Sequence, residues 1–173
     1  MGPYVGGAAA RAARGRRRAH PRPLRRGLRA AHRGEVLSVD FDVPAEVAFA
    51  FLTDPRNRPR WQSSLRRVER ISPPTPGVGQ HWVDVTVPGF RPAMETTVLT
   101  PPVQWTERGR WRSVRAELTL LFALRPGGCR VTAQARVTGW GPVGPLLTRL
   151  APYAVSSDLR RAARLLSRNV TGQ

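Results

Sequence analysis

Few residues outside the first 34 positions of this 173-residue chain are suited to acid–base chemistry. Glu107 is the most informative of them, because it should share one face of a strand with Trp105 and Trp111. All three are odd-numbered positions of the same alternating segment. A carboxyl group on an apolar face loses hydration, and burial raises its pKa toward the range of a general base. Glu107 could therefore abstract a proton, anchor a polar group of a ligand, or lie at a rim paired with an arginine, which is the reading we favour.

His81 is the second, weaker candidate for catalysis, since His20 and His32 both lie in the first 34 residues. His81 begins an alternating segment in which it shares a face with Val83. No nucleophile-elbow motif supports Ser-His-Asp catalysis. Because Cys129 is the only cysteine, the chain cannot form an intramolecular disulfide or an ordinary zinc site, and we expect no metal and no cofactor.

A larger set of residues is expected to face inward and to line either a ligand cavity or an ordinary core. Apolar and polar side chains alternate in several segments, as in antiparallel strands with one dry face and one wet face. Small side chains opposite aromatic ones could leave room for a ligand. Besides Glu107, the predicted lining consists of Val83, Val85, Trp105, Trp111, Leu118, Leu120, Phe122, Ala133, Ala135 and Tyr153.

The segments that must position these residues follow in a defined order. Pro44 is tolerated as a first helical residue, and Asp54 with Pro55 opens a second short helix. A long C-terminal helix supplies the cover that the dry face of the sheet needs. We expect strands at 35–42, 65–71, 80–87, 94–100, 103–111, 114–124 and 131–137, and the C-terminal helix at 146–166. The pattern predicts an α+β fold.

Four motifs in this order resemble the START-like, or SRPBCC, superfamily, and within it the polyketide cyclase/dehydrase-like proteins. They are the helix start from Pro44 to Phe49, Asp54 followed by Pro59-Arg60-Trp61, Gly77-Val78-Gly79, and the hairpin from Pro126 to Thr132, with a terminal helix from Gly144. Cys129 departs from the usual small polar residue or Thr of the family. The resemblance covers residues 35–168. It implies a helix-grip fold, in which a curved antiparallel sheet wraps around the C-terminal helix, with two short helices after the first strand and a cavity between sheet and helix.

The resemblance implies binding of an apolar or aromatic small molecule, lipid- or polyketide-like, more firmly than it implies a reaction. Two alternatives stay open. One is a polyketide aromatase/cyclase-type enzyme without a metal, which would use a few polar groups for enolisation and dehydration. The other is an interaction protein that contacts RNA, ribosome or anionic membrane through an Arg-rich surface.

Charge is distributed unevenly along the chain. All 29 basic residues are Arg, and ten of them lie in residues 1–34 without any acidic residue. We expect a disordered Arg-rich tail at 1–34, a ligand-binding domain at 35–168 and a frayed C-terminus at 169–173. The tail could contact a polyanion weakly, although GC-rich coding also explains its composition and it could be an upstream reading beyond the true start. No apolar run approaches the ~20 residues of a membrane span, and we expect a cytoplasmic protein.

Overall fold

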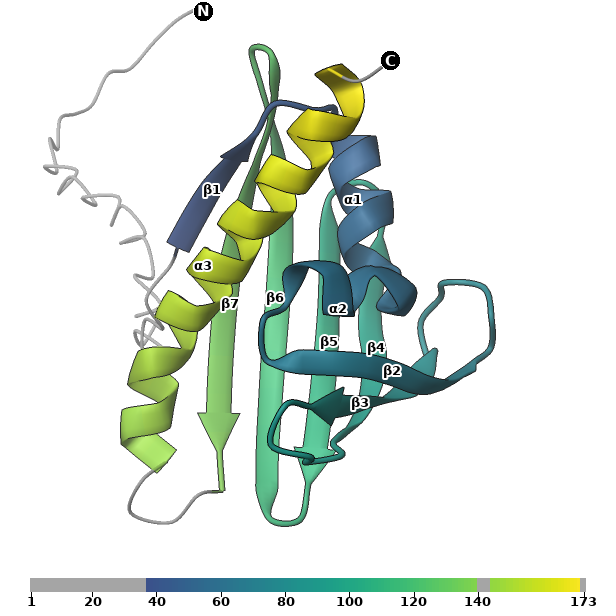
Figure 1. The fold of residues 1–173 in the computed structure, drawn as a ribbon, viewed down its shortest axis with the longest axis vertical. Helices are drawn as coiled ribbons and strands as arrows, with labels where there is room; N and C mark the ends of the chain where they lie inside the picture. The colour runs from purple at the N-terminus through teal and green to yellow at the C-terminus, as the bar shows by residue number, and fades with distance from the viewer. Residues whose placement is uncertain (1–36, 140–143, 172–173) are drawn as a thin grey trace, which may run out of the picture. The chain divides into compact units, whose positions relative to one another are not determined.

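The computed structural model describes residues 37–139 and 144–171, and these carry a single antiparallel sheet of seven strands. The strand order is β1-β7-β6-β5-β4-β3-β2, so the first strand pairs with the last. In chain order the elements are β1 (Leu37–Phe41), α1 (Ala45–Thr53), the 3-10 helix η1 (Pro55–Asn57), α2 (Arg58–Trp61), β2 (Leu65–Ser72), β3 (His81–Thr86), β4 (Ala93–Thr100), β5 (Gln104–Trp111), β6 (Val114–Arg125), β7 (Gly128–Thr138) and α3 (Gly144–Thr171). The predicted α+β helix-grip fold is confirmed, with α3 lying across the curved sheet (Figure 1).

The short helices after β1 are built from capping residues and prolines. The Asp54 side chain accepts a hydrogen bond from the Arg56 backbone N–H at 2.9 Å and so caps η1, whose first residue is Pro55. This 3-10 turn leads directly into α2, which buries Arg58 and Trp61. Because α2 lasts only one turn, its role is to place these two side chains against the sheet.

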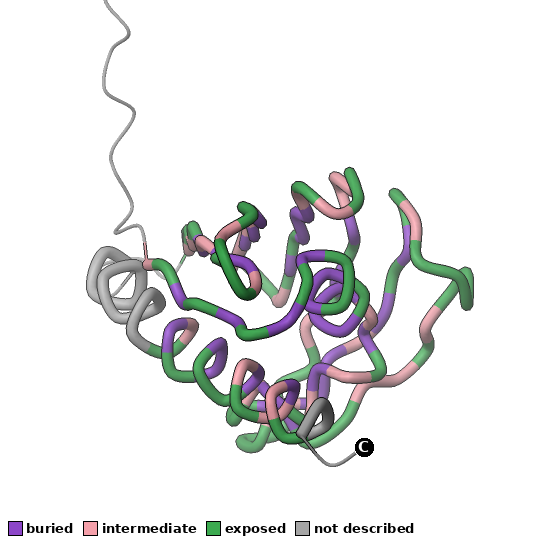
Figure 2. Tube along the Cα trace, turned by 90° about the horizontal axis from the view of Figure 1, so that it is seen from above, coloured by how far each residue is buried: buried purple, intermediate pink, exposed green. Residues whose placement is uncertain are grey.

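The core is made mainly by the inner faces of β1, β6 and β7 together with α1 and the second half of α3. The Phe49 ring of α1 packs against the Phe122 ring of β6, with centroids 5.0 Å apart. Other buried members of this core are Phe41, Leu52, Leu120, Cys129, Val131, Leu159, Ala162 and Leu166. Figure 2 shows buried and exposed positions alternating along the strands and around the described turns of α3, as a two-layer fold requires.

Gly128 allows β1 to approach the β6–β7 hairpin closely. A Cβ atom at this position would lie 2.0 Å from the Phe41 carbonyl oxygen, a distance that no side chain tolerates. The close contact belongs to the pairing of β1 with β7, in which Phe41 lies opposite Cys129. Because Gly128 has no Cβ atom, β1 can pack directly against the end of the hairpin at this point.

The structure differs from the sequence predictions at two places. In β3 the alternate positions Trp82 and Asp84 are buried against the core, whereas His81 is exposed and Val83 is half-buried, so the expected inner face of this strand was wrong, although Val85 is buried as well. Helix α3 continues to Thr171, so that residues 169–171, expected to be frayed, are helical. The predicted tail lies outside the described residues. None of the helices in the described ranges is long and apolar enough to cross a lipid bilayer.

Candidate functional site

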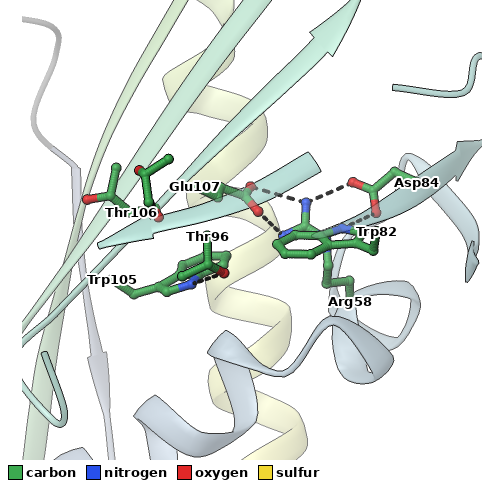
Figure 3. Close-up of polar contacts among 8 residues, drawn as sticks. Arg58, Trp82, Asp84, Thr96, Trp105, Thr106 and Glu107 are labelled. Atoms are coloured by element: carbon green, nitrogen blue, oxygen red, sulfur yellow. Dashed lines mark hydrogen bonds and ion pairs between the residues drawn. The ribbon is translucent and has the colours of Figure 1, made fainter. Parts of the chain in front are cut away.

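A buried arginine joins two carboxylates beneath α2. Arg58 is 3% exposed, and its Nη1 and Nη2 donate to the two carboxylate oxygens of Glu107 at 2.5 and 3.1 Å. Nη2 also donates to Asp84 Oδ2 at 2.9 Å. The Glu107 pairing uses two donors of one planar guanidinium, which is the strong, orienting form of an arginine–carboxylate contact. Figure 3 shows Arg58 reaching from α2 to the carboxylates of β3 and β5.

Trp82 joins this arrangement, and Trp105 and Thr96 form a separate hydrogen-bonded pair beside it, with Thr96 opposite Glu107 in the sheet. Trp82 Nε1 donates to Asp84 Oδ1 at 3.0 Å, and Trp105 Nε1 donates to Thr96 Oγ1 at 3.2 Å. The Arg58 guanidinium carbon lies 5.3 Å from the centroid of the Trp82 ring, within the range of a cation–π contact. We call the six residues Arg58, Trp82, Asp84, Thr96, Trp105 and Glu107 the polar cluster; all six are buried.

Glu107 is the acid–base candidate of the polar cluster. Burial raises the pKa of its carboxyl group, the positive charge of Arg58 opposes that rise, and the negative charge of Asp84 adds to it, so that the pKa is raised to about 7. Burial alone would lower the pKa of Arg58, but Glu107 and Asp84 outweigh it and the pKa rises. Arg58 therefore stays charged, while Glu107 can exchange a proton near neutral pH.

Three buried polar atoms, two in α2 and one just before β3, have no hydrogen-bond partner among the described residues. They are the donors Arg58 Nε and Trp61 Nε1 and the acceptor Gln80 Oε1. A buried polar group without a partner costs on the order of 1–3 kcal/mol. A polar group of a ligand placed beside one of these atoms would therefore be stabilised.

The sheet next to the polar cluster carries small apolar side chains. In register on the inner face, Glu107 lies opposite Leu118, and Leu118 lies opposite Ala135. The next row toward the β5–β6 turn runs from Gly109 through Ala116 to Val137. We call Gly109, Ala116, Leu118, Ala135 and Val137 the apolar floor. Leu118 and Gly109 are buried but Ala116, Ala135 and Val137 are only half-buried, so this part of the inner face is more open than the core.

The structure brings together most of the residues that the sequence predicted to face inward. Trp105, Leu118, Leu120, Phe122 and Ala133 are buried on the inner face, and Ala135 is half-buried there. Glu107 is paired with an arginine as the favoured reading stated, but it is 4% exposed and does not lie at a rim. Tyr153 is part of α3, but its side chain lies outside the described ones.

Four predicted residues lie elsewhere. His81 is exposed on the outer face of β3, away from Glu107, and Val83, two residues further along the strand, shares that face. Val85 is buried, but it is paired with Arg67 of β2. Trp111 ends β5 and is half-buried, with its ring centroid 4.5 Å from that of Phe90.

Sequence reasoning missed Arg58, Asp84, Trp82 and Thr96. Charged residues are almost never fully buried unless they are paired, so a charged residue in a strand is normally assigned to the wet face. Asp84 and Trp82 are two residues apart and therefore share a face of the strand. The large apolar ring of Trp82 was the signal that could have identified this face as the inner one. No local sequence pattern around Arg58 could identify its partners, because Asp84 is 26 residues away and Glu107 is 49 residues away.

Comparison with known proteins agrees with this fold. Residues 36–171 match the sequence profile of the family described as polyketide cyclase/dehydrase and lipid transport. A search of curated protein sequences found no match.

Similar solved structures share the fold at low sequence identity. Protein MLL2253 from Mesorhizobium loti is 17% identical, with a TM-score of 0.63 over 78% of this chain and 96% of that one. A START superfamily protein from Mycobacterium smegmatis is 15% identical, with a TM-score of 0.61 over 78% and 97%. The di-domain ARO/CYC StfQ from the steffimycin biosynthetic pathway is 13% identical, with a TM-score of 0.64 over 79% of this chain and 51% of that one. Because the family profile matches residues 36–171 and the described residues form a helix-grip fold, the chain belongs to the polyketide cyclase/dehydrase and lipid transport family.

Proposed function

We propose that the protein binds an apolar or aromatic small molecule, lipid- or polyketide-like, between the apolar floor and α3. The observation that carries the proposal is the register on the inner face, where the carboxyl-bearing Glu107 stands directly beside Leu118 and, one strand further, Ala135. An apolar surface that adjoins a few convergent polar groups is the usual composition of a small-molecule site. Family membership supports the same class of ligand.

The size of the expected affinity follows from the apolar area that a ligand would bury. A molecule covering about 200 Å² of apolar surface gains about 5 kcal/mol, before the cost of association. That amount permits micromolar binding only if the site is largely preformed. The half-burial of Ala116, Ala135 and Val137 supports a preformed site, because part of the surface of these residues is accessible in the folded chain.

Glu107 and Arg58 would recognise the polar end of the ligand. With a pKa of about 7, the Glu107 carboxyl can donate a hydrogen bond to a carbonyl when protonated and accept one when ionised. The unpartnered Arg58 Nε and Trp61 Nε1 are further donors. A ligand with one or two oxygen atoms at one end of an apolar skeleton fits this set.

A polyketide cyclase-type activity is the second candidate, and the Glu107–Arg58 pair favours it. An ionised Glu107 could remove a proton from a carbon next to a carbonyl, and the Arg58 charge would stabilise the enolate oxygen that forms. The same two groups are already bound to each other through both guanidinium nitrogens, so a substrate would have to displace one of these contacts. Binding without chemistry needs no such exchange and is the function we put first.

A titration with the neutral fluorescent probe N-phenyl-1-naphthylamine tests the proposal, with Ala135→Phe as the perturbing variant. The new ring would fill the space over the floor, and we expect probe affinity to fall at least about tenfold. Ala133→Phe is less suitable, because Ala133 is 3% exposed and belongs to the core. The matched control is Gln134→Phe, which adds the same ring to the exposed outer face one residue away. Equal binding by the parent and Ala135→Phe would overturn the proposal.

A further inference from the structure

The outer face of the sheet carries a concave region, separated from the polar cluster by the sheet itself. It has a volume of about 880 Å³ and lies over β3 to β7. We call it the outer depression. Its charged lining residues, apart from His81, are Arg108, Arg110, Arg115, Arg136, Glu95 and Glu117. Along β5 and β6, Arg108, Arg110, Arg115 and Glu117 alternate with the inner-face residues Glu107, Gly109, Ala116 and Leu118, which places these four side chains on the opposite side of the same strands.

The outer depression has an excess of positive charge. Four guanidinium groups against two carboxylates leave a net charge of +2 when His81 is neutral. Arg108 is paired with Glu117, with 2.9 Å between Nε and Oε2. The side chains of Arg110, Arg115 and Arg136 have no hydrogen bond or ion pair with any residue that the structure describes. Their donors are available to a ligand.

Two of these arginines face each other across neighbouring strands. Arg110 of β5 lies directly opposite Arg115 of β6, and Arg115 lies opposite Thr138 of β7. Directly opposed residues have Cα atoms about 5 Å apart, and like charges in such positions destabilise a sheet. An anion bound between the two guanidinium groups would remove this repulsion and would receive donors from both.

We propose that the outer depression binds a phosphate monoester, with its phosphate group between Arg110 and Arg115. A phosphate monoester carries about −1.5 to −2 charges near neutral pH, which matches the net +2 of the site better than a single carboxylate does. Its three terminal oxygens accept hydrogen bonds from two guanidinium groups in the geometry that arginine favours. The volume of about 880 Å³ exceeds what inorganic phosphate needs and leaves room for the esterified group beside the exposed Ala93. This site does not depend on the function proposed for the inner face.

The same chemistry could come from a soluble phosphate ester or from the headgroup of a phospholipid. Calorimetric titration of the full chain with glycerol 3-phosphate tests the first source. Sedimentation with vesicles containing phosphatidic acid, compared with vesicles containing phosphatidylglycerol, tests the second. Binding of glycerol 3-phosphate, or a preference for phosphatidic acid, supports the site, and failure of both would overturn it.

Matched variants separate this site from the general basicity of the chain. We expect Arg110→Gln/Arg115→Gln to weaken binding at least about tenfold. The control, Arg66→Gln/Arg70→Gln, removes the same charge from two exposed arginines of β2 that have no ion pair among the described residues, and should change binding less than about twofold. Equal losses in the two double variants would show that only net charge matters and would refute the proposal.

The repulsion between the two arginines gives a second readout, which needs no ligand. Arg110→Gln should raise the Tm of the free protein at low salt, and the gain should shrink at high salt, because exposed charges are then screened. Added glycerol 3-phosphate should raise the Tm of the parent but not of the variant. A lower Tm for the ligand-free variant would show that Arg110 is retained for packing and would contradict the proposed role.

Discussion

Replacement of Glu107 by Gln should remove a specific pH dependence of stability. The pKa of Glu107 is about 7 in the folded protein and 4.5 as an unperturbed group. A group whose pKa is raised on folding stabilises the protein fully below its unfolded pKa, and this stability is lost as the pH rises through the folded pKa. The parent should therefore lose stability between about pH 5 and about pH 8 through this residue.

The magnitude follows from the shift itself. The rise of the Glu107 pKa from 4.5 to about 7 corresponds to about 3 kcal/mol of stability, most of it lost between about pH 5 and about pH 8. Because Glu107 is buried, little of this value is screened by solvent. Asp40 and Glu69 have lowered pKa values, chiefly through hydrogen bonds from arginines. Their contributions to stability therefore change at more acidic pH and do not overlap with the change due to Glu107.

Urea unfolding at several pH values measures the effect. The Glu107→Gln variant mimics the uncharged carboxyl, so its free energy of unfolding should vary with pH by about 2–3 kcal/mol less than that of the parent over this window. Glu95→Gln is the control, since Glu95 is an exposed carboxyl on the outer face and its loss should leave the slope unchanged. If Glu107→Gln keeps the slope of the parent, the raised pKa of Glu107 is refuted.

Two further perturbations test the packing around the site. Arg58→Met should destabilise the protein by about 3–5 kcal/mol at neutral pH, because it leaves Asp84 and Glu107 buried without their cation. The control Arg60→Met, at an exposed position of α2, should cost less than about 1 kcal/mol. Chemical denaturation measures both costs, and equal costs would contradict the buried ion pairs of Arg58. Deletion of residues 1–34 should leave the Tm nearly unchanged and unfolding cooperative, because the strands of the sheet and α3 all follow this segment. A calorimetric transition that broadens on deletion would show that the tail belongs to the fold.

The fold was predictable because alternation and helix starts are local properties. In β6, Leu118, Leu120 and Phe122 alternate with less buried positions over a long strand, and such a pattern fits one face of a sheet. Pro44 and Asp54 mark the starts of the short helices in the same local way. The family resemblance rests on these motifs, and the sequence profile confirms it.

The polar cluster was only partly predictable because its burial depends on contacts between distant segments. Glu107 could be singled out, since tryptophans flank it on the same face. Alternation with Val83 and Val85 would place Asp84 on the wet face, and nothing nearby in the sequence contradicts this, because its compensating charge comes from Arg58 in a different element. Burial of either residue alone would be unfavourable, so no local pattern could identify one without the other.

The most direct test of ligand binding on the inner face is a methyl NMR titration of the full chain. Alanine, leucine and valine methyl groups would be labelled with ¹³C, and N-phenyl-1-naphthylamine would be added. We predict saturable shifts at Ala116, Leu118, Ala135 and Val137, with no change at the exposed outer-face residues Ala93 and Ala123. Shifts at the outer positions alone, or no saturable shift at the floor, would contradict the proposed site.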